Sequence, residues 1–92
     1  MMANTRPYGI MLQKPVLKQM RSIPPVVLRH IGERIAALAN DPIPTQAEPI
    51  QGYKGHFRIR IGSYRVIYEV THTIRIITIV RIAHRKDVYR NL

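Results

Sequence analysis

The side chains with the clearest chemistry in this sequence are arginines that alternate with apolar residues. Arg58, Arg60 and Arg65 lie in the stretch HFRIRIGSYRVIYEV, residues 56–70. A guanidinium group stays protonated, binds two phosphate oxygens at once and stabilises negative charge, but it does not act as an ordinary base. The stretch therefore predicts contact with phosphate groups.

The charge of the whole chain supports the same interpretation. The 92 residues include 15 Lys and Arg against five Asp and Glu, a formal net charge of +10. Residues 53–92 hold nine basic and two acidic side chains, and residues 1–52 hold six and three. Arginine-rich, strongly basic surfaces are typical of nucleic-acid binding. We therefore expect a polyanionic partner, with nucleic acid ranked above an acidic protein.

Other kinds of catalytic site are missing from the sequence. It has no cysteine, no carboxylate pair suited to glycoside or aspartic chemistry, no glycine-rich phosphate loop and no metal-ligand spacing among its four histidines. We therefore expect no metal and no cofactor. Proton transfer is left to His56, His84, Lys54 or Tyr89. Such a set fits RNA cleavage by the substrate's own 2′-hydroxyl, because the protein then supplies only positioning and charge.

The elements that must position these residues are those of a single α+β domain over residues 1–92. The sequence predicts a strand at 8–12, a short helix at 14–23 and a second helix from about 24 to 39. The second helix has an apolar stripe that should face the core: Val27, Ile31, Ile35 and Leu38. The segment NDP ends it, with Asn40 suited to a left-handed cap.

The second half of the chain is predicted to be a loop followed by strands. Residues 41–55, with three prolines and two glycines, form the loop, and strands follow at 56–61, 64–70 and 74–83. The third of these strands is apolar on both faces and should be central. The tail HRKDVYRNL closes the chain as a short turn or helix. The predicted architecture is a helical hairpin on one face of a mainly antiparallel sheet, in β-α-α-β-β-β order.

Gly62-Ser63 suits a type II′ hairpin turn, which predicts the register of the first two long strands. Arg60 then lies opposite Arg65, and the acid expected near them is Glu69 alone. Like charges placed opposite each other cost up to about 1 kcal/mol. A hairpin that tolerates this repulsion gains from an anionic ligand. Arg81 and Arg85 add to the basic set, whereas Arg75 lies at the opposite end of its strand and is predicted to be a solvated charge.

Each of these residues also has a purely structural interpretation. Arginine stems cover apolar surface well, so a basic sheet face can be inert. His56 faces Glu69 in the predicted register and can pair with it. His84 suits structural hydrogen bonding and proton transfer equally. Tyr64 and Tyr68 are predicted to be core aromatics.

The segments FRIRIGSYRVIYEV and IVRIAHRKDVYR, with the order of the elements, resemble the RelE branch of the RelE/ParE toxin superfamily. The resemblance covers nearly the whole chain. It implies a toxin of a type II toxin–antitoxin pair, a ribosome-dependent endonuclease that cuts mRNA in the ribosomal A site and leaves a 2′,3′-cyclic phosphate. It also implies a small acidic RelB-like antitoxin, bound in a hetero-oligomer through an apolar helix.

The resemblance carries roles for individual residues. It implies a catalytic set of Arg65, Arg85 and Tyr89, with His84 in reserve. The expected RNA-binding set is Arg58, Arg60, Arg81, Lys54 and His56. The best-known members have lysines where this chain has Arg58 and Arg60. An arginine hardly serves as base, so that role moves to Tyr89, whose phenol surrounding cations would acidify.

Two other functions remain open on the sequence. One is a ParE-like inhibitor of DNA gyrase, with the same fold and no nuclease activity. The other is a non-catalytic nucleic-acid-binding module, in which the arginines hold phosphate and Tyr89 packs. The sequence has no signal peptide and no apolar run of the ~20 residues that a membrane span needs. We therefore expect a soluble, cytoplasmic protein with no membrane partner.

Overall fold

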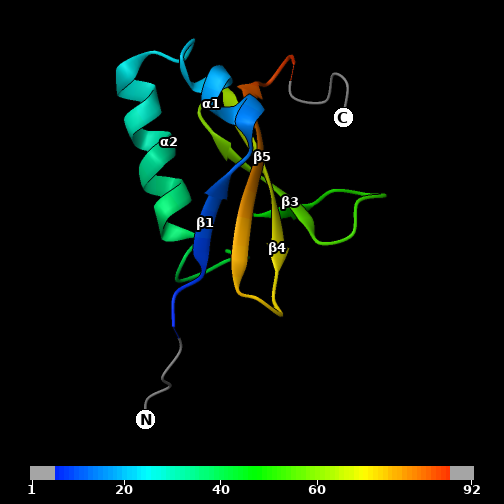
Figure 1. The fold of residues 1–92 in the computed structure, drawn as a ribbon. Coiled ribbons are helices and arrows are strands. Elements are labelled where there is room, and N and C mark those ends of the chain that lie inside the picture. Colours follow the sequence, from blue (N-terminus) through cyan, green and yellow to red (C-terminus); the bar gives the residue numbers. More distant parts are fainter. Residues whose placement is uncertain (1–5, 88–92) are drawn as a thin grey trace.

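Two helices lie against a β-sheet (Figure 1). Their buried apolar side chains belong to the core that they share with the sheet. The computed structural model describes residues 6–87. Helix α1 spans Lys14–Met20 and helix α2 spans Pro25–Ala37, each with a proline in its first turn, where a missing backbone N–H costs nothing. Among the described residues, neither helix nor any other helical segment is long and apolar enough to cross a membrane.

Helix α2 ends slightly earlier than predicted, and its C-terminus has a different hydrogen-bonding pattern from the predicted left-handed cap. Its last turn tightens, with the backbone N–H groups of Leu38 and Ala39 donating to the carbonyls of Ile35 and Ala36. Asn40 does not adopt the predicted left-handed conformation, since Arg75 is the one non-glycine residue in the described part with a positive φ. The tightened turn satisfies the last carbonyls, so no left-handed cap is needed.

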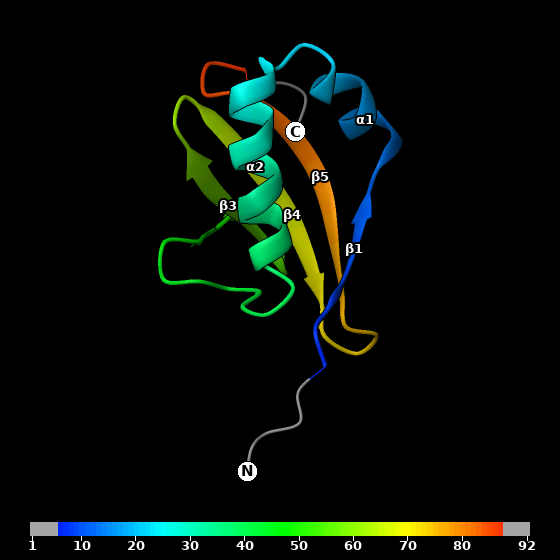
Figure 2. The same ribbon diagram turned by 90° about the vertical axis from the view of Figure 1, so that its left-hand side faces the viewer.

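The sheet has five strands in the order β1-β5-β4-β3-β2. They are β1 (Gly9–Leu12), β2 (Glu48–Pro49), β3 (His56–Ile61), β4 (Tyr64–Thr71) and β5 (Ile76–His84). Strand β1 runs parallel to β5 and the other pairs are antiparallel. The predicted α+β architecture, with its helices on one face of the sheet, is confirmed (Figure 2). The prediction of a continuous loop over 41–55 is wrong, because β2 lies within it.

The β3–β4 hairpin has the predicted register. Ile61 pairs with Tyr64 and Arg60 pairs with Arg65. Gly62 has a φ of 61°, as a type II′ turn requires at its first central position. The side chains of β3 and β4 therefore alternate between the helices and the opposite face as predicted.

Strand β5 departs from simple alternation through a β-bulge at Val80. Tyr68 pairs with Ile79 and the preceding Ile67 pairs with Arg81, so Val80 is an extra residue in β5. Before the bulge, Ile79 faces the helices; strict alternation would send residue 81 the same way. The bulge turns Arg81 to the opposite face instead.

Gln19 of α1 holds the strand beside the bulge. Its Oε1 accepts a hydrogen bond of 2.8 Å from the backbone N–H of Ile82. Strand β1 ends at Leu12, where the chain turns into α1, so it cannot supply a backbone carbonyl at this height. The side-chain amide of Gln19 takes the place of a strand partner.

The core lies between the helices and the sheet, and Tyr68 is its largest fully buried side chain. The Tyr68 hydroxyl donates to the carbonyl of Pro42, at 2.7 Å. Burial, with a smaller contribution from the charge of Asp41, raises the pKa of Tyr68 to about 12. The prediction that Tyr68 is a core aromatic is confirmed, and Tyr64 packs against the same core while remaining half-buried.

We predict that Tyr68 makes the fold sensitive to alkaline pH. The folded protein holds the Tyr68 proton up to about pH 12, whereas an unfolded tyrosine releases it near pH 10. The stabilisation is complete below about pH 10 and is lost as pH rises toward 12, with a loss of about 1 kcal/mol at pH 11. Urea unfolding at about pH 9 and about pH 11 measures this loss in the free energy of unfolding.

Tyr68→Phe is the matched control, since it keeps the ring and removes the proton. At about pH 9 it should be less stable than the native chain by about 1 kcal/mol, because the Pro42 carbonyl loses its donor. The difference should shrink at about pH 11. A difference that stays constant or grows with pH would contradict the assignment.

Candidate functional site

Four arginines lie on the sheet face that the helices leave uncovered. We call this surface the arginine face and define it by Arg58, Arg60, Arg65 and Arg81. The register places them in two adjacent rows across three strands: Arg60 beside Arg65, and Arg58 and Arg81 on either side of Ile67. Neighbouring strands are about 4.8 Å apart, so the backbones of Arg58 and Arg81 are separated by roughly 10 Å.

Ile67 lies at the centre of this face. It is fully buried but does not belong to the core between the helices and the sheet. Arg58 and Arg81 flank it in its row, and their aliphatic stems are long enough to cover it. The stems therefore have a structural role in addition to any role of the guanidinium groups.

Arg58 and Arg60 have different surroundings. Arg58 pairs with Glu48 of β2 in an ion pair, and its side chain is 23% exposed. The expectation that Glu69 is the one acid near the arginines is therefore wrong, because the unpredicted strand β2 brings Glu48 to Arg58. Arg60 is exposed and lines a hollow of about 320 Å³ with Thr45 and Gln46.

Arg65 and Arg81 are oriented by backbone carbonyls. Arg65 Nη1 donates to the carbonyls of Gly62 and Tyr64, at 3.1 and 3.0 Å. Arg81 Nη2 donates to the carbonyl of Asp87, at 2.8 Å. The first contact holds a guanidinium against the β3–β4 turn, and the second ties the segment after β5 to the arginine face.

Arg85 is brought to the same end of the sheet by its backbone. Its N–H donates to the carbonyl of Ser63 in the β3–β4 turn, at 2.7 Å, and its side chain is exposed. The structure therefore gathers Arg65 and Arg85 around one turn. Tyr89 lies outside the described residues.

The predicted proton-transfer residues are not all brought to this end. His84 shares the face of Tyr64, against whose ring it lies at 5.8 Å and 76°, while its neighbour Ala83 is on the face of Arg65. His84 Nδ1 accepts from the N–H of Lys86, at 3.3 Å. These contacts fit the structural alternative for His84.

Lys54 and His56 lie toward the other end of β3. His56 Nδ1 donates to the carbonyl of Lys54, at 3.1 Å, and His56 faces Glu69 by register. Four residues of strand separate His56 from Arg60, about 13 Å. These two residues can extend a phosphate-binding track but lie away from the Arg65–Arg85 end.

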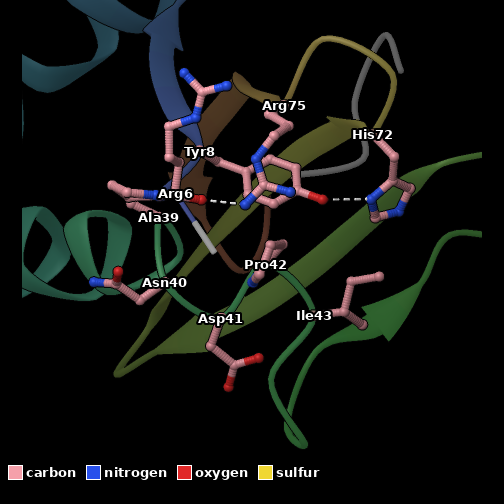
Figure 3. Close-up of a pocket in the computed structure, with 10 residues that line it drawn as sticks. Arg6, Tyr8, Ala39, Asn40, Asp41, Pro42, Ile43, His72 and Arg75 are labelled. Atoms are coloured by element: carbon pink, nitrogen blue, oxygen red, sulfur yellow. Dashed lines mark hydrogen bonds between the residues drawn. The ribbon is translucent and has the colours of Figure 1, made fainter. Parts of the chain in front are cut away.

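A larger polar pocket lies at the opposite end of β5, where that strand begins (Figure 3). Its volume is about 410 Å³, and three of its lining residues, Tyr8, His72 and Arg75, are joined by the contacts that follow. The Tyr8 hydroxyl is 2.7 Å from His72 Nδ1, and the Arg75 guanidinium lies 4.3 Å from the Tyr8 ring centroid and donates to the Arg6 carbonyl. The prediction that Arg75 is a solvated charge is wrong.

Arg75 also has a φ of 53°, in the left-handed region that costs a non-glycine residue of the order of 1 kcal/mol. The stacking on Tyr8 and the bond to the Arg6 carbonyl offset this cost. We assign the pocket a structural role, since its cation fastens the start of β1 to the β4–β5 turn.

Two residues that matter for the arginine face were missed on the sequence. Glu48 pairs with Arg58 from β2, and Gln19 holds the backbone beside the bulge that turns Arg81 to this face. No pattern in the neighbouring sequence indicates the role of either residue, because each contacts a residue distant in the chain. A sequence prediction of β2 would have placed Glu48 opposite Arg58.

The sequence of this chain matches a known protein family and named relatives. Residues 10–89 match the family described as "ParE toxin of type II toxin-antitoxin system, parDE". A protein of Methanocaldococcus jannaschii named "Putative toxin RelE1" is 37% identical over 87 residues, covering 91% of this chain and 97% of its own.

Solved structures show the same fold. The archaeal RelE–RelB complex from Pyrococcus horikoshii has a chain that is 29% identical, with a TM-score of 0.76 and coverage of 85% of this chain and 94% of that one. A mutant of the E. coli toxin RelE in the free state has the same TM-score, 0.76, at 16% identity, covering 87% of this chain and 85% of that one. The second likeness concerns the fold alone.

We predict that Gln19 keeps Arg81 on the arginine face. Gln19→Leu removes the acceptor for the Ile82 N–H, which should lower the free energy of unfolding by about 1–2 kcal/mol. Amide exchange at Ile82 should accelerate with it. Urea unfolding and hydrogen exchange measure the two effects.

Gln19→Glu keeps an acceptor oxygen and should stay close to the native chain in both measurements. Gln13→Leu makes the same change at an exposed position whose side chain caps no helix. Equal exchange at Ile82 in Gln19→Leu and Gln13→Leu would refute the prediction.

Proposed function

Because the chain belongs to the RelE branch of the RelE/ParE superfamily of type II toxins, we propose that it is a ribosome-dependent endoribonuclease that cleaves mRNA in the A site. The observation that carries the proposal is the arginine face with Arg85 at its end: five arginines on one face of the three inner strands and beside the β3–β4 turn. Glu48 forms an ion pair with one member of this set, Arg58. A polyanion is the ligand that such a surface favours.

In the proposed reaction, the 2′-hydroxyl oxygen of one nucleotide attacks the adjacent phosphorus. The bond from phosphorus to the 5′-oxygen of the next nucleotide breaks, which leaves a 2′,3′-cyclic phosphate and a 5′-hydroxyl. A base takes the 2′-hydroxyl proton and an acid supplies one to the leaving oxygen. The reaction consumes no water and no cofactor, so the protein contributes orientation, charge and proton transfer.

The arginines would serve this reaction in two groups. Arg65 and Arg85, gathered at the β3–β4 turn, would stabilise the charge that develops on the attacked phosphate. Arg58, Arg60 and Arg81 would hold neighbouring phosphates, with Lys54 and His56 extending the track along β3. The Arg65 guanidinium suits the first role, because backbone carbonyls set its position before the substrate arrives.

Proton transfer is proposed for Tyr89. The arginines cannot act as bases at neutral pH, and the contacts of His84 are with Tyr64 and Lys86. The Arg81–Asp87 bond anchors the chain two residues before Tyr89. Weak acid–base groups would explain a requirement for the ribosome, which would supply the attack-ready RNA geometry.

The proposed partners follow from this function. They are the ribosome and mRNA during cleavage, in the cytoplasm, and a small acidic RelB-like antitoxin at other times. The relatives from Pyrococcus horikoshii and M. jannaschii were solved as RelE–RelB complexes. An acidic partner suits a chain of net charge +10.

A second candidate is a ParE-like inhibitor of DNA gyrase, because the matching family carries the ParE description. It predicts blocked supercoiling by gyrase and intact mRNA. A non-catalytic nucleic-acid-binding module predicts neither effect. The two experiments below separate these possibilities.

We predict that the chain cuts mRNA on programmed ribosomes, with ends that map to the A site by primer extension. Arg85→Ala and Tyr89→Phe should each reduce cleavage by about 100-fold or more, because each removes a group that acts on the reacting atoms. Arg34→Ala, which removes a cation from α2, should leave cleavage unchanged. Uncut mRNA together with inhibited gyrase would replace this function by the second candidate.

We also predict salt-sensitive binding of single-stranded RNA through the arginine face. Arg60 is exposed, so Arg60→Ala should weaken binding and reduce the slope of log affinity against log salt by about 0.7, the value for one phosphate contact. Fluorescence anisotropy with a short labelled RNA measures the slope. An identical loss in Arg34→Ala would show that net charge alone, and not this face, governs binding.

A further inference from the structure

The turn between β2 and β3 carries an exposed tyrosine beside the arginine face. Tyr53 is 43% exposed, whereas the other tyrosines and the phenylalanine among residues 6–87 are buried or half-buried. In Figure 1 this turn projects beyond the sheet, on the side away from α2. The function proposed above uses the cations next to this tyrosine but not its aromatic ring.

Backbone hydrogen bonds fix the position of Tyr53. Its N–H donates to the carbonyl of Ile50, and its carbonyl accepts from the N–H of His56, both at 3.1 Å. The Ile50 N–H donates to the His56 carbonyl, at 3.0 Å. The carbonyl of Gly55 accepts from the N–H of Val70 on β4, at 2.9 Å, which ties the turn to the sheet. The turn therefore holds the ring in place without a ligand, so binding would not need to order it.

The ring of Tyr53 is joined to the arginine face through His56. His56 shares the face of Arg58 and Arg60, because these residues alternate with apolar ones along β3. The centroids of the Tyr53 and His56 rings are 6.0 Å apart and their planes meet at 62°, so the rings are in edge contact and are not stacked. This contact covers at most one face of the Tyr53 ring. A second planar group can therefore lie against the other face.

The charges near Tyr53 indicate the chemistry of that planar group. Residues 49–68 contain one lysine, three arginines and no acid, and the lysine, Lys54, is exposed. At the ends of this stretch, Glu48 pairs with an arginine of the arginine face and Glu69 lies opposite the histidine by register. An exposed aromatic ring among cations is typical of single-stranded nucleic-acid binding, because bases stack on the ring while the cations hold phosphates.

We propose that Tyr53 stacks against a nucleobase of single-stranded RNA whose phosphates lie along the arginine face. The proposal rests on the proposed function, which supplies the RNA substrate. His56 lies two residues before Arg58, about 7 Å along β3, so the stacked base belongs to a nucleotide outside the Arg65–Arg85 end. Tyr53 is therefore a substrate-binding residue that touches none of the reacting atoms. Every base has a flat face, so the contact requires no particular base.

The test measures binding of the full chain to a short labelled RNA by fluorescence anisotropy. Tyr53→Leu keeps apolar bulk and removes the ring, and it should weaken binding by about 5- to 50-fold. The slope of log affinity against log salt should stay native, because no charge is removed. Tyr53→Phe keeps the ring and should bind like the native chain. Val26→Ala shortens an apolar side chain of α2 that is 63% exposed, and it should also bind like the native chain.

A ribose-phosphate oligomer of the same length that lacks bases separates stacking from charge. The native chain should bind this oligomer more weakly than it binds the RNA, and Tyr53→Leu should bind it as tightly as the native chain does. If Tyr53→Leu weakens the binding of both ligands equally, the proposal is overturned, because the ring would then shape the turn and contact no base.

A tryptophan at the same position reports the contact directly. The chain has no tryptophan, so Tyr53→Trp introduces a single indole fluorophore. Its emission should be quenched when RNA binds, because a base stacks on the indole, and should be unchanged by the oligomer without bases. Val26→Trp places the fluorophore on α2 and should not respond to RNA. Emission of Tyr53→Trp that saturating RNA leaves unchanged would overturn the proposal.

The possible failures are distinguishable. If the native chain cuts mRNA on programmed ribosomes and Tyr53→Leu binds RNA as tightly as the native chain, the stacking proposal is overturned and the proposed function stands. If RNA binding depends on the ring and mRNA stays uncut, the proposed function fails and the stacking site stands. If Tyr53→Leu binds RNA normally but binds the antitoxin more weakly, the ring belongs to a protein contact and the proposal is overturned.

Discussion

The β-bulge at Val80 sets which side chains of β5 reach each face of the sheet. Tyr68 pairs with Ile79 and Ile67 with Arg81, so the extra residue reverses the alternation partway along the strand. Ile77 and Ile79 enter the core before the bulge, Ile82 enters it afterwards, and the charge between them turns outward. Without this irregularity either a guanidinium would point into the core or the apolar end of β5 would be exposed.

The arginine face tolerates its like charges because its four arginines have different surroundings. Arg58 is paired with a carboxylate, Arg65 and Arg81 are held by backbone carbonyls, and Arg60 is exposed to water. The stems of two of them flank the buried Ile67. The arginine stems therefore pack against the sheet, while their guanidinium groups give its outer surface a positive potential. Apolar residues could replace the packing of the stems but not the charge.

The two faces of the sheet differ in charge and polarity. One presents guanidinium groups held close to the backbone, and the other presents an apolar groove beside a glycine in α2. The first surface favours contact with anions, and the second favours contact with apolar groups. Because the sheet separates them, changes on one side can be tested without removing groups from the other.

Sequence by itself determined the elements that local signals govern. The II′ turn at Gly62 fixed the pairing of Arg60 with Arg65, and the apolar periods placed α2 and the core face of β3 and β4. Tertiary structure alone decided the two-residue strand β2, the bulge at Val80 and the roles of Glu48, Gln19 and Arg75. The physical reason is distance along the chain. A turn and a period depend on neighbouring residues, whereas an ion pair across β2 and β3, or an amide that replaces a missing strand, exists only after remote segments have packed.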